Sequence, residues 1–323
     1  MAEIARETCW VVTDGRAGIE AQAQGLAEAV ARKAPIVIET KRVKVMPPHR
    51  SWPRVLWGDP FARLDMAGDA LAAPWPALWI ACGRLSVPFS MAVKLRSPQT
   101  YVVQLQTPHA PLKYFDLVIP PLHDRLSGDN VFPILGAPNR LDAARLATNS
   151  APGLAPVAVL IGGPNKAFSL EPADAVLLAD WLAALQMPLD VTLSRRTPRK
   201  AAEIFATRLG SQSARFYDPI KDGAGANPYL AMLGTARAIL VTEDSVNMAT
   251  EAASTGKPVY ILPLRRKAFA SAGKFDGFHA SLRNHGAARL FNGEIEAWTY
   301  APLDETARAA SEVIRRWRAY RGE

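Results

Sequence analysis

The sequence predicts an α/β protein with two Rossmann-like domains, each built on a doubly wound parallel sheet. First, the chain has 323 residues, more than the ~250–300 residues that a single hydrophobic core usually organises. Second, short apolar runs alternate with helical patterns, which favours parallel strands joined by right-handed crossovers. Third, segment 139–156 is rich in Ala and then in Ser, Pro and Gly, so it predicts a linker between two domains.

The first predicted domain covers residues 1–150 and contains short apolar runs that are typical of buried strands. A helix is expected over 21–33 because Leu26 and Val30 lie on one face of it. Segment 46–65 combines several prolines with aromatic residues, so it is expected to be irregular. The predicted strands are 9–13, 36–40, 76–81, 100–105 and 116–120, and a second helix is predicted over 87–95.

The second predicted domain covers residues 151–303 and alternates strands and helices more regularly. In sheets of this kind, ligands bind at the carboxyl ends of the strands. Polar residues that directly follow a predicted strand are therefore the first candidates for a site. The predicted strands are 157–163, 189–194, 214–218, 239–242 and 258–264, and the predicted helices are 172–185, 199–209, 227–236 and 245–254.

A last amphipathic helix is predicted over 304–320, with Val313, Ile314 and Trp317 in its apolar stripe. We expect residues 304–323 to cross back and pack on the first domain. Several arginines crowd the end of this helix, where cations suit the helix dipole. They either lie in solvent or contact a membrane surface or a partner.

The composition excludes several classes of protein. The net charge is +8 without a block of like charges, so no nucleic-acid partner is expected. The positive excess instead suits phosphate-bearing substrates or peripheral contact with an anionic membrane surface. No stretch of ~18 apolar residues lacks a charge, so no transmembrane helix is predicted. No basic region followed by an apolar run opens the chain, so we expect a cytoplasmic protein, with any membrane contact at the inner face.

The cysteines and histidines give no sign of a metal site. Cys9 and Cys82 lie in apolar runs and are interpreted as small buried residues. The chain has no H-E-x-x-H motif, no C-x-x-C motif and no carboxylate cluster, so no metal is expected. A G-x-S-x-G elbow and a Walker A loop are also absent from the sequence.

The strongest candidate site is the segment 240–263. A predicted strand runs into the polar turn 242–245, and a helix begins there with Asp244 or Ser245 as its cap. The free N–H groups and the dipole of a helix N-terminus favour a bound phosphate. An ordinary strand–helix–strand unit has the same caps, so the motif alone leaves both interpretations open.

Three further loops follow predicted strands. Gly162 and Gly163 end one strand and allow either close approach of a ligand or a tight turn. Segment 194–198 holds two arginines that suit a pyrophosphate, although a solvated loop would have the same sequence. In segment 13–18, Asp14 is a candidate general base, and the glycines there lack the pattern of a dinucleotide fingerprint.

Five pieces of the sequence, in order along most of the chain, resemble the elongated-mitochondria family. That family includes plant proteins linked to mitochondrial fission and many bacterial proteins described as glycosyltransferases. Segment 240–263 also resembles the donor-site motif of GT-B glycosyltransferases, in which a helix N-terminus faces the donor pyrophosphate. There an acidic residue, matched by Glu251, accepts hydrogen bonds from ribose hydroxyls, and a G-x-P turn follows. The pieces are TDGRAG (13–18), QLQTP (104–108), LIGGP (160–164), SRRTP (194–198) and DSVNMATEA…GKP (244–258).

The resemblance implies a GT-B fold with two domains facing a cleft, and a glycosyltransferase that needs no metal and no cofactor. The expected donor is a nucleotide sugar, specifically a UDP-sugar, and the unidentified acceptor is expected to be an envelope or lipid-linked molecule. Asp14 is the candidate catalytic residue, and the acceptor-side residues are Arg16, Gln106 and His109. The residues expected to bind the donor are Gly162, Gly163, Ser194, Arg195, Arg196, Thr197, Thr242, Glu243, Asp244, Ser245, Asn247 and Glu251.

Two other functions stay open at this point. Sugar-nucleotide epimerases use the same two-domain frame, and they would change the sugar without an acceptor. A non-catalytic scaffold related to the mitochondrial-fission proteins would have kept the fold and lost turnover. Nucleotide binding separates the scaffold from the two enzymes.

Overall fold

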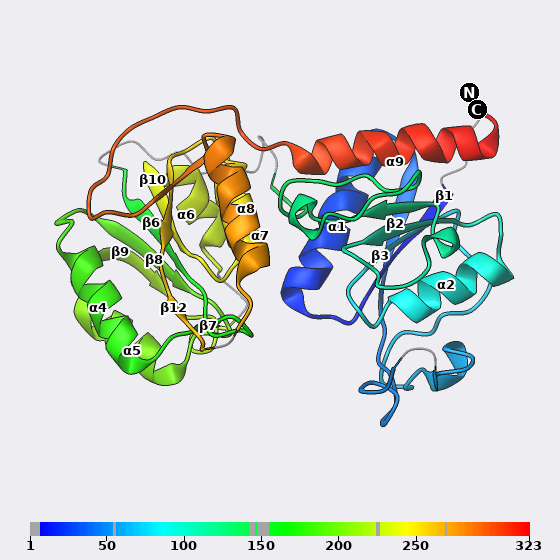
Figure 1. Cartoon of the computed structure of the whole chain (residues 1–323), viewed down its shortest axis with the longest axis horizontal. Helices are drawn as coiled ribbons and strands as arrows, with labels where there is room; N and C mark the ends of the chain where they lie inside the picture. The colour runs from blue at the N-terminus through cyan, green and yellow to red at the C-terminus, as the bar shows by residue number, and fades with distance from the viewer. Residues whose placement is uncertain (1–6, 54–55, 142–145, 147–154, 224–226, 269) are drawn as a thin grey trace. The chain divides into compact units, whose positions relative to one another are not determined.

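The computed structural model describes residues 7–323 except 54–55, 142–145, 147–154, 224–226 and 269 (Figure 1). The chain divides into two compact units, which are described separately. The first unit joins Met1–Arg140 to Asp304–Glu323, and the second is Leu141–Leu303. Most of the linker predicted at 139–156 lies outside the described residues.

The sheet of the first unit has five strands in the order β2-β1-β3-β4-β5, and all neighbouring pairs are parallel. The order reverses between β1 and β3, which is the switch point where doubly wound sheets bind their ligands. The strands are β1 (Glu7–Thr13), β2 (Ile36–Arg42), β3 (Leu78–Cys82), β4 (Tyr101–Leu105) and β5 (Leu117–Ile119).

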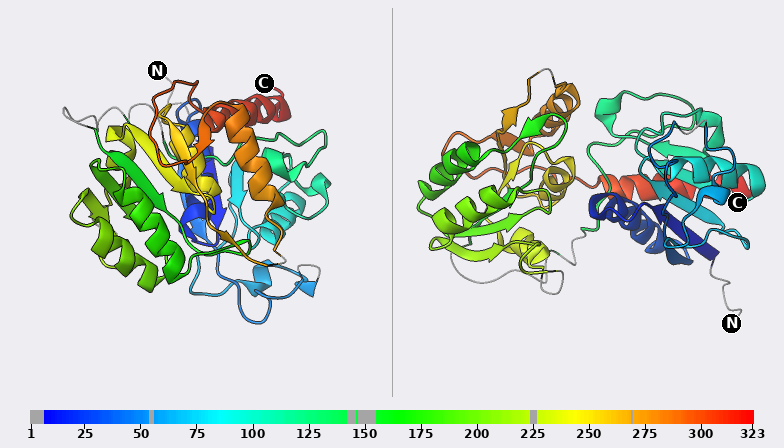
Figure 2. Two further views of the ribbon diagram at one scale, coloured as in Figure 1. Left: turned by 60° about the vertical axis from the view of Figure 1, so that its left-hand side comes forward. Right: turned by 90° about the horizontal axis from the view of Figure 1, so that it is seen from below.

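Helices cover both faces of this sheet because side chains alternate along each strand. On one face, Cys9 and Val11 pack with α1 (Ala17–Ala31) and α9 (Glu305–Arg321). On the other face, Trp10 and Val12 share a cluster with the buried residues of α2 (Val87–Arg96). The chain's last helix therefore completes the core of the first unit, as the sequence predicted, and Figure 2 shows α9 running beside α1.

The sheet of the second unit has six parallel strands in the order β13-β11-β10-β6-β8-β9. Counted along the chain this is 6-5-4-1-2-3, the order of dinucleotide-binding folds, and its switch point lies between β6 and β10. The strands are β6 (Val157–Ile161), β8 (Leu189–Leu193), β9 (Ser213–Tyr217), β10 (Ala238–Thr242), β11 (Val259–Leu262) and β13 (Ala288–Leu290).

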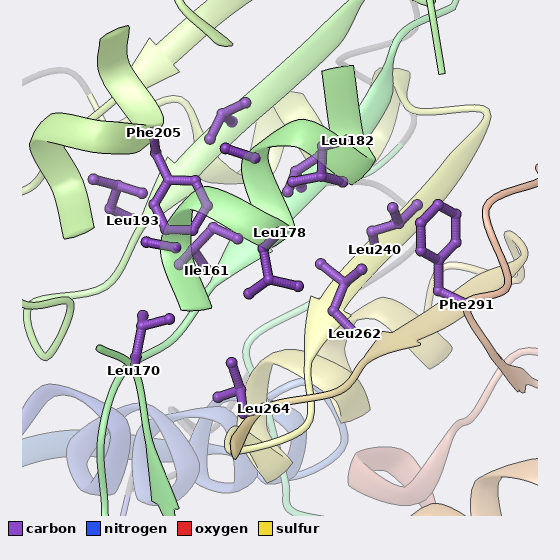
Figure 3. Close-up of a cluster of buried hydrophobic side chains, with 14 of the residues drawn as sticks. Ile161, Leu170, Leu178, Leu182, Leu193, Phe205, Leu240, Leu262, Leu264 and Phe291 are labelled. Atoms are coloured by element: carbon purple, nitrogen blue, oxygen red, sulfur yellow. The ribbon is translucent and has the colours of Figure 1, made fainter. Parts of the chain in front are cut away.

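Buried aliphatic side chains join this sheet to α4 and α5 on one face. Leu178 and Leu182 of α4 and Phe205 of α5 pack against Ile161 and Leu240 of the sheet (Figure 3). The opposite face carries α6, α7 and α8 (Figure 1). The helices are α4 (Pro172–Ala183), α5 (Arg199–Leu209), α6 (Tyr229–Thr235), α7 (Val246–Ala253) and α8 (Gly273–Asn284).

The structure confirms the predicted α/β class with two parallel sheets, and it adds elements that the sequence did not reveal. Helix α8 contains two glycines and an asparagine, which disfavour helix, but it buries Phe278 and Leu282. A short antiparallel pair joins β7 (Phe168–Ser169) to β12 (Arg265–Arg266). The described residues of segment 46–65 are irregular as expected, and they include a short 3-10 helix at Phe61–Arg63. Within the described residues, no helix has the length and apolarity needed to cross a bilayer.

Candidate functional site

The switch point of the second sheet gathers three loops from different parts of the chain. They follow β6, β8 and β10, and they contain Gly162 and Gly163, the segment 194–198, and Asp244. Parallel strands end at the same edge, so the site residues predicted from separate motifs meet there.

Asp244 is the centre of this edge. Its carboxylate is buried and accepts hydrogen bonds from the Gly163 N–H (3.1 Å), the Thr242 hydroxyl (2.7 Å) and Arg196 Nη2 (2.6 Å). Each donor comes from a different loop or strand end. The carboxylate thus holds the three loops together, and a buried charge with this many donors is strongly stabilised by them.

At the two glycines after β6, other parts of the protein occupy the space that a side chain would take. A Cβ atom at position 162 would lie 2.2 Å from Asp244 Oδ1, and one at 163 would lie 2.2 Å from the Arg196 carbonyl oxygen. The sequence left open whether these glycines admit a ligand or make a tight turn. In the structure, Asp244 and the backbone of the β8 loop fill the space that a side chain would need.

The loop after β8 is folded around the hydroxyl of Thr197. That hydroxyl donates to the Gly162 carbonyl (2.6 Å) and accepts from the Ser194 N–H (3.0 Å). Arg196 donates to the Gly163 carbonyl (3.0 Å) as well as to Asp244. The two predicted arginines therefore differ: Arg196 ties loops together, whereas the Arg195 side chain is exposed and contacts no group among the described residues.

Helix α7 begins at the end of β10. Ser245 caps it by accepting a hydrogen bond from the Met248 N–H (3.3 Å). The first turn of a helix leaves N–H groups without an acceptor inside the helix, and in α7 this turn begins with Val246. Asn247 lies in the same turn and already has a contact within the protein. Together with the helix dipole, the Val246 amide makes the start of α7 suitable for an anion.

Glu251 lies further along α7 and is half-buried. Its Oε2 atom accepts a hydrogen bond from the Tyr229 hydroxyl at 2.5 Å. Burial raises the pKa of Glu251 to about 7, although the Tyr229 hydrogen bond opposes the shift. The carboxyl group therefore changes charge near neutral pH. Sequence reasoning missed Tyr229, because its contact joins residues 22 positions apart on different helices.

Lys257 is a second titrating group that the sequence did not single out. Its Nζ atom donates to the Leu233 carbonyl (2.7 Å) and to the Gly234 carbonyl, both in the last turn of α6. Burial lowers the pKa of Lys257 to about 8. The hydrogen bond between Tyr229 and Glu251 thus anchors the start of α6, and the hydrogen bonds from Lys257 anchor its end.

Glu243 faces away from the start of α7. Its Oε1 atom accepts from the Leu264 N–H (2.7 Å), and its backbone carbonyl contacts His279 Nε2 (2.8 Å). Burial raises the pKa of Glu243 and lowers that of His279. His279 comes from the unpredicted helix α8, so a sequence pattern could not have placed it beside Glu243.

The switch point of the first sheet brings together the other predicted residues. Asp14 and Arg16 form an ion pair at 2.8 Å, with Asp14 nearly buried and Arg16 exposed. Gln106 has a left-handed backbone (φ 66°) and donates to Gln22 of α1 at 3.1 Å. His109 instead lines a pocket beside α2. Across the described parts of both units, no group of three or more metal-ligating side chains is found.

The strand orders and the loops at the switch points define the class of protein. The chain is similar in structure to the glycotransferase of kitacinnamycin, with a TM-score of 0.50, 12% identity, and coverage of 98% of this chain and 96% of that one. It is also similar to a candidate UDP-N-acetylglucosamine 2-epimerase from Listeria monocytogenes, with a TM-score of 0.56, 11% identity, and coverage of 98% and 97%. The protein has the GT-B fold found in glycosyltransferases and sugar-nucleotide epimerases.

Sequence comparison identifies the family. Residues 17–317 match the family described as Mitochondrial fission ELM1. The chain is 32% identical to the mitochondrial fission protein ELM1 of Arabidopsis thaliana over 306 residues, which cover 83% of this chain and 70% of that protein. It is 29% identical to an uncharacterized protein of Rickettsia prowazekii (strain Madrid E) over 359 residues, with coverage of 95% and 97%. The chain belongs to the mitochondrial fission ELM1 family, which confirms the family predicted from the five sequence pieces.

Proposed function

We propose that this protein is a metal-independent glycosyltransferase that takes a sugar from a nucleotide sugar, with a UDP-sugar as the expected donor. One observation carries the proposal. At the switch point of the second sheet, an exposed arginine follows β8, and a helix N-terminus and a titrating carboxyl group belong to α7, which follows β10. The arginine and the helix N-terminus suit a diphosphate, and the carboxylate suits ribose hydroxyls.

Each group has a separate task in the proposed donor complex. The Val246 amide and the dipole at the start of α7 bind the diphosphate, and Arg195 adds a charge-assisted hydrogen bond. Ionised Glu251 accepts hydrogen bonds from the ribose hydroxyls. When the sugar leaves, negative charge grows on the diphosphate, and the helix dipole with Arg195 stabilises that charge in place of a metal ion.

Asp14 is the proposed base for the acceptor hydroxyl. Its pairing with Arg16 fixes the orientation of its carboxylate, and a base must lie within hydrogen-bond reach of the proton that it removes. Asp14→Asn keeps the shape and removes the basic oxygen. We expect it to lower kcat by at least tenfold while nucleotide affinity stays unchanged.

An epimerase is the second candidate, because a solved structure with this fold is described as one. Such an enzyme would convert a nucleotide sugar with no acceptor present. A scaffold, the third candidate, fits the printed description of the Arabidopsis relative. It would bind no nucleotide.

The first test is thermal unfolding with UDP, GDP, CMP, ADP and dTDP, without added metal. A nucleotide at ~100 times its Kd adds about 2.7 kcal/mol to the free energy of unfolding. We expect Arg195→Ala and Glu251→Gln to reduce this gain. Arg237→Ala is the matched control, because Arg237 is exposed and precedes β10 at the opposite edge of the sheet. No stabilisation by any of the five nucleotides would reject both enzymes and favour the scaffold.

A further inference from the structure

A pocket of about 530 Å³ lies in the first unit, beside α2. Its walls come from the outer face of α2, the irregular segment before residue 60, and the chain that follows β4. This volume lies within the range of small-molecule sites, which are usually apolar with a few placed polar groups. No function described so far uses it.

Helix α2 has an apolar stripe on each side. Its inner residues Val87, Phe89 and Val93 are buried against the sheet. Its outer residues Pro88, Met91, Ala92 and Leu95 line the pocket, and their spacing places them on one face. A helix on a protein surface normally turns a polar face outward. The second apolar stripe, with Leu95 69% exposed, therefore indicates a face that an apolar ligand covers.

The pocket lining also includes two aromatic residues, Tyr114 and the almost fully buried Trp57. With the apolar residues of α2, they give the pocket a largely apolar lining that suits a hydrocarbon chain. Burial of such a chain contributes roughly 0.8 kcal/mol for each methylene group.

The pocket has one cationic side chain. Its described lining includes Arg84 and no carboxylate. Arg84 Nη2 donates to the Arg50 carbonyl at 2.6 Å, which fixes the guanidinium, and no described carboxylate forms an ion pair with it. A fixed guanidinium at the rim of an apolar slot attracts an anionic group, and its geometry matches a phosphate.

The backbone from which Arg84 projects starts beside the candidate acceptor residues. Arg84 follows β3 directly after Gly83, and a Cβ atom at Gly83 would lie 3.8 Å from Arg16 Nη2 and 3.9 Å from Asp14 Oδ2. The pocket therefore belongs to the same end of the first sheet as the carboxylate proposed as the base, and it extends along α2.

We propose that this pocket binds the hydrocarbon chain of a lipid phosphate whose head group contacts Arg84, and that such a lipid is the acceptor. The acceptor role rests on the proposed glycosyltransferase function. Binding of the lipid does not, so the two ideas can fail separately.

The test measures binding of dodecyl phosphate below its micelle-forming concentration by calorimetry, with dodecanol and inorganic phosphate as comparisons. We expect dodecyl phosphate to bind at least tenfold more tightly than dodecanol, and inorganic phosphate to give no heat. Arg84→Gln should reduce the affinity for dodecyl phosphate to that for dodecanol. Equal affinities for the two ligands, or an unaffected Arg84→Gln variant, would overturn the proposal.

Two variants locate the ligand. Ala92→Phe fills the slot, and Leu95→Glu places a carboxylate on its wall at an exposed position that tolerates substitution. Both should lower the affinity for dodecyl phosphate at least tenfold. Ala319→Phe is the matched control, because Ala319 is an exposed alanine of α9 outside the pocket, and it should bind like the wild type. Leu95→Glu decides the result if Ala92→Phe fails to fold.

Three outcomes distinguish this proposal from the alternatives. Binding to phosphatidylglycerol vesicles without binding of monomeric dodecyl phosphate would mean surface contact with a membrane, and it would overturn the pocket. Nucleotide binding without lipid binding would overturn the pocket and leave the transferase intact. Lipid binding without nucleotide binding would remove the acceptor role and keep the site.

Discussion

The carboxyl edges of the two sheets are organised in opposite ways. In the second unit, a buried carboxylate, Asp244, binds three loops together, and most predicted polar residues contact one another. In the first unit, the candidate residues form two smaller groups: Asp14 with Arg16, and Gln106 with Gln22, whose Oε1 atom also accepts from Cys82 Sγ. A pocket lies in the same unit, beside α2. The described contacts therefore join the candidate residues of the second sheet through one carboxylate, whereas those of the first sheet are less extensively joined.

The largest effect is expected from Asp244→Ala. The change leaves the Gly163 N–H and the Thr242 hydroxyl without an acceptor and releases Arg196, so we expect a loss of about 2–4 kcal/mol in the free energy of unfolding. Urea unfolding measures it. Asp180→Ala is the control, because the Asp180–Arg208 pair is exposed and contributes at most about 1 kcal/mol. Similar losses of unfolding free energy in both variants would mean that the hydrogen bonds of Asp244 stabilise the protein no more than an exposed ion pair does.

Gly162→Ala is expected to cost about 1–3 kcal/mol, because its methyl group would overlap the Asp244 carboxylate. Gly273→Ala serves as the comparison. A Cβ atom there meets nothing closer than 3.9 Å, so alanine in the first turn of α8 should be neutral or slightly stabilising. If both variants keep wild-type stability, the glycine after β6 is not required by packing, and room for a ligand becomes the better explanation.

The pH dependence of donor binding gives a smaller effect. With the pKa of Glu251 at about 7, its carboxylate form is about tenfold less populated at pH 6 than at pH 8. A nucleotide sugar that requires the carboxylate should therefore bind about tenfold more weakly at pH 6. Calorimetry at the two pH values measures this, and the Glu251→Gln variant should show no such slope. A flat wild-type profile would show that Glu251 does not contact the ribose.

The free energy of unfolding should change in the opposite direction to donor binding, at pH values between 4.5 and 7. The pKa of Glu251 rises from its ordinary value of 4.5 to about 7 on folding, so the folded state binds more protons between these values. The free energy of unfolding therefore falls as the pH rises from 4.5 to 7 and levels off above it. Comparison of wild type with Glu251→Gln isolates this contribution.

The smallest effect is expected at the carboxyl edge of the first sheet. A left-handed backbone costs a non-glycine residue about 1–2 kcal/mol, and the Gln106–Gln22 hydrogen bond contributes a similar amount. Gln106→Gly should therefore change stability by less than about 1 kcal/mol while it weakens turnover. Gln186→Gly is the control, because Gln186 also has a positive φ (49°) and follows α4. Glycine there should be stabilising, and an equal gain at position 106 would mean that the contact to Gln22 contributes nothing.

Elements that depend on one local sequence pattern could be predicted from the sequence. The strand predicted at 157–163 spans Val157–Ile161, and the helix cap predicted at Asp244 or Ser245 is Ser245. Contacts between distant segments could not be read in this way. The difference between Arg195 and Arg196 depends on Asp244, 48 positions further along the chain than Arg196. Helix α8 has poor helix formers and exists because Phe278 and Leu282 are buried.

Helix α9 has a consequence for how the protein is made. The first unit consists of Met1–Arg140 and Asp304–Glu323, so the helix that closes its core is synthesised only after the whole second unit. The second unit is continuous in sequence and can complete its fold earlier, whereas the first must wait on the ribosome with the apolar face under α9 uncovered. A premature stop that removes only this last segment would leave the nascent first unit exposed to chaperones and proteases, even though every candidate site residue had been translated.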